Sequence, residues 1–454
     1  MNLSIKNVVV LLVCSVSLIL VGCKKSSSPN YNINVTTSGL IGSGVLVQLN
    51  LTYDLSINTN GVSTFTTQFP DTTVYSLTVK TLPNVPPQNC VLANPNGTIS
   101  GSDVTNITLT CAPVEFAYLT NSNSNTILAL AVDESTGGLL QNSAPVATGA
   151  NPVAFTLSPT GRYAVAVNQG DASVSSFLVN ATSGLLVSGG ASVATGAGSM
   201  PLAAAVDPSN SFVYVANSGN ATLSGFAINS TTGALKCIGG SAPPCAAAAS
   251  TGTTPSALAF ATQSGISYLY VANAGSNTVS GYQLQLPSGG LSAIASVGTG
   301  SVPTAIAVTS TAVPFVYVVN SGDGTVSGYS VNSGNLLSSG AAISTGGAAP
   351  TAIAIAPTGQ YAYVTNSGSN TVAAFSIGSG GALTSLGAPV ATGNTPKSVS
   401  VVATPASPSG AFLYVANSAD NSVSIYSIAA NGTLAGLATQ SIGNGPISFV
   451  SSAK

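Results

Sequence analysis

Short apolar runs, separated by turns rich in glycine and asparagine, fill the chain from about residue 114 to its end. Small or β-branched residues alternate with aromatic residues along these runs, and a period of two residues predicts β-strands. One representative stretch has runs at 350–356, 361–365 and 371–377, turns at 357–359 and 367–370, and an outer run near 388–391. This stretch predicts one small antiparallel sheet of four strands.

The same pattern returns seven times around an asparagine. The seven central residues are Asn121, Asn168, Asn217, Asn273, Asn320, Asn366 and Asn417, spaced by 46 to 56 residues. A tyrosine precedes the asparagine by three positions in six copies (Val165 replaces it in the second), and a threonine or serine follows it by five. Four strands in a repeat of this length are typical of a propeller blade, so residues 114–454 predict an all-β fold, a seven-bladed β-propeller.

The two ends of this region predict how the ring closes. The repeats open on a second strand, Phe116–Thr120, without a first strand before it. The chain ends with 445–450, which matches the first strands of the other repeats. The last segment should therefore complete the first blade and remove its free edge, and deletion of the residues after Asn444 should destabilise the ring.

Residues 31–113 show alternation of another kind and predict a small β-sandwich module. Strand-like runs at 45–49 and 74–79 are separated by Asn60-Gly61 and Asn96-Gly97, which suit hairpin turns. Cys90 and Cys111 lie in its last two strand-like pieces, and in an oxidising compartment we expect them to form a disulfide.

The N-terminus predicts an export signal. Lys6 precedes a mostly apolar run at 8–21, interrupted by Ser15 and Ser17, which is too short to span a bilayer comfortably. It ends in Leu20-Val21-Gly22-Cys23, which resembles the lipobox of bacterial lipoproteins, with residues 1–23 as signal peptide and lipid attached to Cys23. Residues 24–30 would be a polar tether, and Lys24 after the cysteine implies the outer membrane. An ordinary signal peptide or a short anchor helix is the alternative.

The repeat unit Tyr-Val-(Ala/Thr)-Asn-Ser-Gly-x-Asn-Thr-Val resembles the YVTN-type propeller repeat. The linkers at 135–139, 231–235 and 380–383 resemble the same position in lactonase-like, 6-phosphogluconolactonase-like seven-bladed propellers. That resemblance implies a possible lactone hydrolase whose His, acidic and Arg residues surround the central channel. With no His and a single Arg in the sequence, none of those residues can be carried over. The N-terminal module resembles the transthyretin-like or immunoglobulin-like sandwiches of bacterial surface proteins.

Composition narrows the possible chemistry. Charged residues make up 4% of the chain and the net charge is −2, so no long-range field favours nucleic acid. The absence of His removes the commonest general base and metal ligand. We therefore predict no catalytic residues, no metal ligands and no cofactor.

The loops before the first strands, here called the mouth loops, should line one mouth of the channel. They are Gly149–Pro152, Gly196–Pro201, Gly252–Pro255, Gly300–Pro303, Gly346–Pro350, Gly393–Pro396 and Gly443–Pro446. The one charge beside them is Lys397, which is either a contact for a carboxylate or phosphate ligand or a solvated cation. Asp171, Asp323 and Asp420 share one repeat position and are interpreted as turn caps, with a calcium ring as the alternative.

The single arginine and a pair of cysteines are interpreted without reference to a ligand at the mouth. Arg162, in a turn that should face the other side of the ring, is interpreted as a surface residue. Cys237 and Cys245 are expected to pin an inserted loop by a disulfide, because a redox pair usually has two residues between its cysteines and here there are seven.

Three functions remain open at this point. The first is a lipid-anchored propeller of the cell envelope that binds or scaffolds without catalysis, its partners being the membrane through Cys23 and an envelope protein or polysaccharide. The alternative is a lactonase-like hydrolase acting on a sugar lactone. The third, a variant of the first, is a surface coat or adhesion protein.

Overall fold

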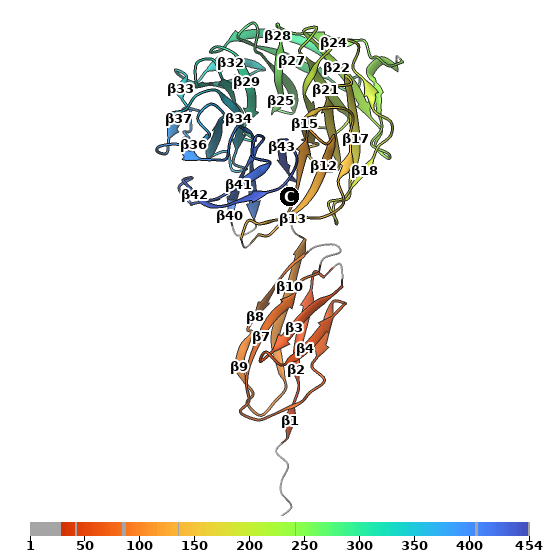
Figure 1. Ribbon diagram of the computed structural model, residues 1–454, viewed down its shortest axis with the longest axis vertical. Coiled ribbons are helices and arrows are strands. Elements are labelled where there is room, and N and C mark those ends of the chain that lie inside the picture. Colours follow the sequence, from red (N-terminus) through yellow and green to blue (C-terminus); the bar gives the residue numbers. More distant parts are fainter. Residues whose placement is uncertain are drawn as a thin grey trace, which may run out of the picture.

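A computed structural model describes residues 29–40, 43–83, 88–113, 115–134, 136–240, 242–404 and 407–452. The signal segment with Cys23 lies outside these residues. Figure 1 shows a ring of sheets and, below it, an elongated smaller body that leads into the ring through the strand β10. Within the described residues no helix is long and apolar enough to span a membrane.

The smaller body is a sandwich of two four-stranded sheets. One sheet has the order β5 (Gly61–Thr64), β2 (Ile33–Ser38), β10 (Val104–Pro113), β8 (Gln88–Ala93), and the other β4 (Tyr53–Ile57), β3 (Val45–Leu49), β7 (Val74–Thr81), β9 (Asn96–Thr98). A short pair, β1 (Asn30–Tyr31) with β6 (Phe69–Pro70), adds to them. Strands β2 and β10 run parallel, and the other recorded pairs are antiparallel.

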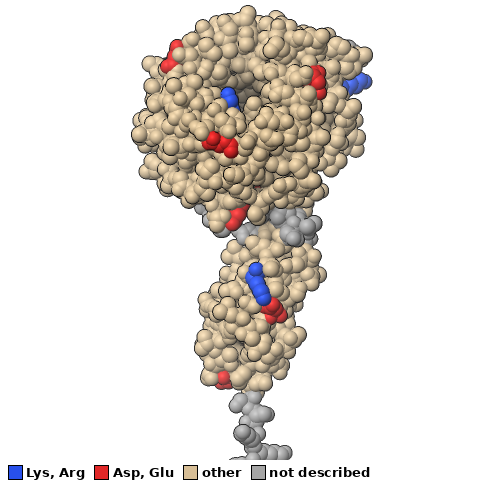
Figure 2. All heavy atoms as spheres, in the orientation of Figure 1, with Lys and Arg blue, Asp and Glu red and all other residues tan. Residues whose placement is uncertain are grey.

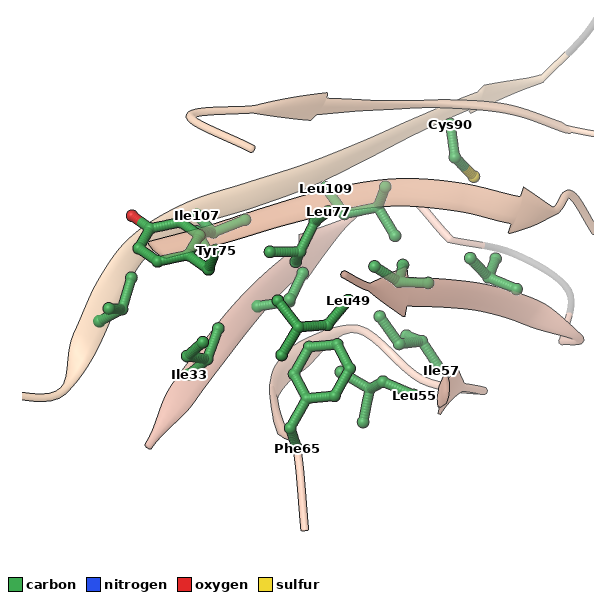
Figure 3. Packing of buried hydrophobic residues seen from close by; sticks show 14 of the residues in the cluster. Ile33, Leu49, Leu55, Ile57, Phe65, Tyr75, Leu77, Cys90, Ile107 and Leu109 are labelled. Atoms are coloured by element: carbon green, nitrogen blue, oxygen red, sulfur yellow. The ribbon is translucent and has the colours of Figure 1, made fainter. Parts of the chain in front are cut away.

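Alternate residues of both sheets form the sandwich core. Ile33, Leu49, Leu77 and Leu109 point toward one another between the layers (Figure 3), and each is at most 3% exposed. Cys90 and Cys111 lie directly opposite each other on β8 and β10, with their Cα atoms 4.0 Å apart, and form the expected disulfide. In the chain-entropy model, closing a loop of about 20 residues contributes about 3 kcal/mol to stability.

Two turns expected in the sandwich differ from the hairpins predicted. Asn96 and Gly97 lie within β9, because Gly97 pairs with Tyr75, and a Cβ at Gly97 would come within 2.4 Å of the tyrosine hydroxyl. The bend lies before it, at Asn94, whose φ is 54°. The chain bends at residues 59–60 and Gly61 opens β5, but the strands on either side, β4 and β5, belong to different sheets. Gly97 is thus required for close packing against Tyr75, and the preference of Asn-Gly pairs for turns does not predict this role.

The ring consists of seven antiparallel sheets, as predicted. The innermost strands are β43 (Pro446–Ser451), β15 (Pro152–Leu157), β20 (Pro201–Val206), β25 (Pro255–Gln263), β29 (Pro303–Val308), β34 (Pro350–Ile355) and β39 (Pro396–Thr404). The second strands are β11 (Phe116–Asn121), β16 (Tyr163–Asn168), β21 (Phe212–Asn217), β26 (Ile266–Asn273), β30 (Phe315–Asn320), β35 (Tyr361–Asn366) and β40 (Ser407–Asn417). The third strands are β12 (Thr126–Val132), β17 (Ser173–Val179), β22 (Thr222–Ile228), β27 (Thr278–Gln285), β31 (Thr325–Asn332), β36 (Thr371–Ile377) and β41 (Ser422–Ile428).

The outermost strand is less regular than the repeat suggests. It is continuous in two blades, as β28 (Gly290–Gly298) and β42 (Leu434–Ser441). In the other five it is split into β13 (Leu139–Gln141) and β14 (Val146–Ala147), β18 (Leu186–Ser188) and β19 (Val193–Ala194), β23 (Leu235–Cys237) and β24 (Ala247–Ser250), β32 (Asn335–Ser338) and β33 (Ile343–Ser344), and β37 (Leu383–Ser385) and β38 (Val390–Ala391). A short 3-10 turn, Ile238–Gly240, lies in the third blade. Numbered in chain order, blade 1 holds β11–β14 with β43, and blades 2 to 7 begin at β15, β20, β25, β29, β34 and β39.

The C-terminal strand closes the ring as the sequence predicts. β43 pairs antiparallel with β11, with Phe449 opposite Leu119, so the innermost strand of blade 1 comes from the end of the chain. Phe449 is 1% exposed, and its ring stacks on Tyr414 of blade 7 with the ring centroids 5.0 Å apart. One strand therefore joins the first blade to the last.

The repeated tyrosine binds six of the seven blades to the next. Tyr317 of blade 5 is fully buried, and its hydroxyl donates to the carbonyl of Gly381 in blade 6 at 2.8 Å. Gly381 has a φ of 81°, and a Cβ there would stand 2.2 Å from the ring of Phe315. The same bond is made by Tyr118, Tyr214, Tyr270, Tyr363 and Tyr414 to Gly184, Gly289, Gly334, Gly432 and Gly137. Blade 2 lacks it, because Val165 has no hydroxyl.

Candidate ligand site at the channel mouth

The mouth loops share one backbone feature in all seven blades. The residue before each innermost-strand proline is left-handed, with φ between 45° and 64°. These residues are Asn151, Met200, Thr254, Val302, Ala349, Thr395 and Gly445. The conformation is unfavourable for β-branched side chains, but it lets the loop bond to the turn opposite: Ser321 and Gly322 donate their backbone N–H groups to the carbonyls of Val302 and Ser301 at 2.9 and 3.0 Å. The ladder thus continues past the proline, which has no N–H of its own.

The central asparagine of each repeat fixes the turn beside its mouth loop. Asn320 is fully buried, and its amide donates to the hydroxyls of Thr325 and Ser327 at 3.1 and 2.9 Å. A Cβ on Gly300 would stand 2.7 Å from the side chain of Asn320, so this mouth loop needs a glycine there. The hydroxyl five residues after the asparagine therefore has a structural role, and the repeat pattern is explained without reference to a ligand.

The three repeated aspartates cap the mouth loops, as the turn interpretation predicts. The carboxylates of Asp171, Asp323 and Asp420 accept the backbone N–H groups of Ala150, Ser301 and Asn394 at 3.0, 2.5 and 2.5 Å. In blade 6 the hydroxyl of Ser369 accepts from Ala348 in the same way. Each carboxylate is bound within its own blade, which accounts for it without the calcium ring considered as the alternative.

A second cap, which the sequence did not reveal, joins neighbouring blades. Asn125 accepts the N–H of Asn151, in the next blade, at 2.7 Å. Asn277, Asn370 and Asn421 accept those of Val302, Thr395 and Gly445 in the same way. The signal was present four residues after the central asparagine, where asparagine recurs in a left-handed conformation, but its partner lies about 25 residues further on. Mouth loops held from two blades form a rigid rim.

Lys397 is the cationic residue of this rim. It is the second residue of β39, an innermost strand, and its side chain is exposed. In the three preceding blades the same position holds Ser256, Thr304 and Thr351, whose hydroxyls donate to the proline carbonyl of the following blade at 2.7, 3.1 and 2.9 Å. Figure 2 shows a basic group beside the central hollow, with separate acidic groups further out on the same face.

Lys397 has no carboxylate partner among the described residues, where the recorded ion pair joins Lys80 and Asp54 of the sandwich. Its ammonium is therefore available to a ligand. The position after the proline in the other blades carries no charge: Val153, Leu202, Ser256, Thr304, Thr351 and Ile447. The rim thus offers one cation, together with hydroxyl and amide groups and the three capping carboxylates, and the cation can contact an anionic or carbonyl group of a polyhydroxylated ligand.

One carboxylate at this rim, that of Asp420, is poorly suited to act as a general base. The backbone N–H of Asn394, and then its side-chain amide, stabilise the charged form of Asp420 and lower the pKa of that carboxyl below its usual value. A general base works best with a pKa near the operating pH, and this shift has the opposite direction. Among the described residues no three His, Cys, Asp or Glu side chains come together.

The remaining predicted residues lie away from the mouth. Arg162 lies in the turn between β15 and β16, on the side of the ring opposite the mouth loops. Cys237 and Cys245 form a disulfide across the loop between β23 and β24. The two disulfides fit an oxidising, extracytoplasmic compartment.

The architecture defines a seven-bladed propeller with a polar channel mouth, whose rim carries one ammonium group and three hydrogen-bonded carboxylates. The sequence matches the family described as "Lactonase, 7-bladed beta-propeller" over residues 94–202 and 307–454. Because this match covers more than half of the chain, the protein belongs to that family.

Solved structures share this fold at low sequence identity. The periplasmic gluconolactonase PpgL of Pseudomonas aeruginosa superposes with a TM-score of 0.63 at 18% identity, over 75% of this chain and 99% of that one. A candidate 6-phosphogluconolactonase of Bacteroides fragilis gives 0.62 at 22% identity, over 75% and 98%. A protein from Lactobacillus plantarum gives 0.61 at 18%, over 75% and 100%. No curated protein matches the sequence.

Proposed function

We propose that the propeller recognises a small sugar lactone or its sugar acid at the channel mouth, and that Lys397 contacts the carbonyl or carboxylate of that ligand. The observation that carries the proposal is the single exposed ammonium on a rigid rim of hydroxyl, amide and backbone groups. The ligand class comes from the lactonase family and from the gluconolactonase named among the structural relatives.

Recognition without turnover is the outcome that the rim chemistry supports. Asp171 and Asp420 accept hydrogen bonds at both carboxylate oxygens, which hold them as caps of the mouth-loop turns. The lowered pKa of Asp420 weakens it as a base. A lysine ammonium by itself can bind an anion or polarise a carbonyl, but it does not supply a base.

Hydrolysis of a sugar lactone at the same mouth is the second candidate. Family membership favours it, and the comparisons support it better than they support a binding or scaffold role. In that case the ammonium of Lys397 would polarise the lactone carbonyl and stabilise the negative charge that develops when water attacks.

One experiment separates these functions. The soluble chain starting at Lys24 is incubated with D-glucono-1,5-lactone, and opening of the ring is followed by proton release; D-gluconate binding is measured by calorimetry. Saturable gluconate binding that Lys397→Gln weakens about tenfold, without lactone turnover, supports recognition. Turnover above the spontaneous rate that Lys397→Gln abolishes supports the hydrolase. Neither binding nor turnover, or binding unchanged in Lys397→Gln, overturns the mouth as the ligand site.

We also propose that the protein is a lipoprotein of the bacterial envelope, with its lipid attached to Cys23. The two disulfides support export, and the lipobox-like Leu20–Cys23 supports the anchor. Expression of the full chain in a bacterium fed an alkyne-labelled fatty acid should give a labelled, membrane-bound protein. Cys23→Ser should lose the label and leave the membrane fraction, and equal labelling of both proteins would contradict the anchor.

A further inference from the structure

A second cavity lies between blades 2 and 3, on the side of the ring opposite the mouth loops. Its volume is about 520 Å³, within the range typical of small-molecule sites. The turn that holds Thr160 and Arg162 lines one side, and the turn 209–211 of blade 3 lines the other. We call this cavity the Arg162 groove. It is formed by exposed ends of strands, well away from Lys397.

The groove contains the one arginine of the sequence, and its charge is not neutralised. Within the described residues Arg162 forms no ion pair, and its Cζ atom lies 5.4 Å from the centre of the Tyr163 ring. The nearby carboxylate of Asp207 is fully buried and already engaged, because it accepts the backbone N–H groups of Ser209, Ser211 and Phe212 at 2.9, 2.8 and 2.6 Å. The guanidinium is thus left to an external anion.

The rest of the lining is polar on one side and apolar on the other. Thr160 donates from its hydroxyl to Asn210 at 2.8 Å, which ties the turns of the two blades together. Ser211 and Ser230 add further polar groups, while Val179 and Ile228 form an apolar wall. A ligand that fits this lining has an anionic group, hydroxyl groups and an apolar face.

The corresponding groove between blades 4 and 5 shows what is special about the Arg162 groove. It measures about 300 Å³ and is lined by Phe260, Thr262 and the turn Thr309–Thr311, without a charged residue. Blade 2 is also the blade in which Val165 replaces the tyrosine that binds one blade to the next. Tyr163 instead donates its hydroxyl to the carbonyl of Ser230, at the wall of the groove, at 2.9 Å. The blade 2–3 junction is therefore both larger and charged.

We propose that the Arg162 groove binds a small sugar acid of the uronate class. The planar guanidinium pairs with the carboxylate through two parallel N–H···O bonds, a geometry that lysine cannot reproduce. The sugar hydroxyls meet Thr160 and the serines, and the C–H face of the sugar ring lies against Val179 and Ile228. This site does not depend on the function proposed for the mouth.

The test is calorimetric titration of the soluble chain starting at Lys24 with D-glucuronate. Arg162→Gln should weaken binding about tenfold or more, because a charge-assisted pair is lost. Arg162→Lys should recover only part of the affinity, since it keeps the charge without the fork. Lys236→Gln, which removes an exposed cation on β23, is the matched control for net charge and should bind as the wild type does. All these titrations are made in a Lys397→Gln background, so that a sugar acid bound at the mouth does not contribute to the measured affinity.

Three results would overturn the proposal. The first is no D-glucuronate binding by the wild type. The second is equal binding by Arg162→Gln and the wild type. The third is equal affinity for D-glucuronate and inorganic phosphate, since that would reveal an unselective anion site. A fold control by circular dichroism accompanies each variant, and the exposed position of Arg162 makes misfolding an inadequate explanation for a loss.

Discussion

Replacing Phe449 by alanine tests ring closure at the point where the two ends of the propeller meet. The side chain is 1% exposed, lies opposite Leu119 of β11 and stacks on Tyr414 of blade 7. The backbone of Phe449 is also held in place, because its N–H group donates to the hydroxyl of Ser398 at 3.0 Å. Because two blades hold this site, the structure cannot collapse into the cavity that the alanine leaves. The loss in the free energy of unfolding should therefore approach the roughly 3–5 kcal/mol typical of Phe→Ala in a core.

This loss translates into a measurable shift of the melting temperature. With about 2.1 cal/mol/K of unfolding entropy per residue, a ring of about 340 residues has about 0.7 kcal/mol/K, and Phe449→Ala should lower its Tm by about 4–7 °C. Differential scanning calorimetry is the suitable assay because the sequence has no Trp to report unfolding by fluorescence. Deletion of residues 445–454 should lower the Tm further, since it leaves β11 as a free edge.

The matched control is Leu140→Ala, which truncates an apolar side chain that is 65% exposed on the outer strand of the same blade. It should shift the Tm by no more than about 1 °C, as surface substitutions do. If Phe449→Ala melted like Leu140→Ala, or the deletion like the full chain, the strand would not be closing the ring.

Three further outcomes follow from the contacts that join and shape the blades. Tyr317→Phe leaves the carbonyl of Gly381 unpaired and should cost about 1–3 kcal/mol in urea unfolding, whereas exposed Tyr53→Phe should cost nothing measurable. Gly300→Ala places a Cβ 2.5 Å from the carboxylate of Asp323 and should destabilise by about 1–3 kcal/mol, while Gly298→Ala, with open space around it, is tolerated. Alkali should unfold the ring cooperatively. Burial raises the pKa of the six buried cross-blade tyrosines above its ordinary value, so the folded state keeps protons that the unfolded state releases. Stability is therefore full below pH about 10 and falls by about 8 kcal/mol per pH unit above it. A circular-dichroism titration that stayed flat to pH 12 would contradict this expectation.

The periodic features of the molecule were readable because they are local. Alternating residue types along a short run predict a strand, and Gly, Asn and Pro between the runs predict a turn. The blade count, the order of strands and the closing role of 445–450 therefore followed from the sequence. The disulfide partners Cys90–Cys111 and Cys237–Cys245 followed as well, because each pair is close in sequence. The same local reasoning went wrong at Asn96-Gly97, where the glycine is required by the ring of Tyr75 across the sheet and not by a turn.

Contacts between blades were decided by the tertiary structure alone. The sequence shows a tyrosine three residues before six of the seven central asparagines, but only packing shows that its hydroxyl reaches a glycine carbonyl in the next blade, 64 residues away in the case of Tyr317. Likewise, Arg162 reads as a surface residue until the turn of blade 3 is placed beside it and the two enclose a cavity. Lys397 gains its significance from the ring, which brings seven separate loops to one rim and leaves a single cation among them. The spacing of residues along the chain determines which strand or turn forms. Which residue lies opposite another across two blades depends on how the sheets pack, and that packing is determined jointly by all the residues that the sheets bury.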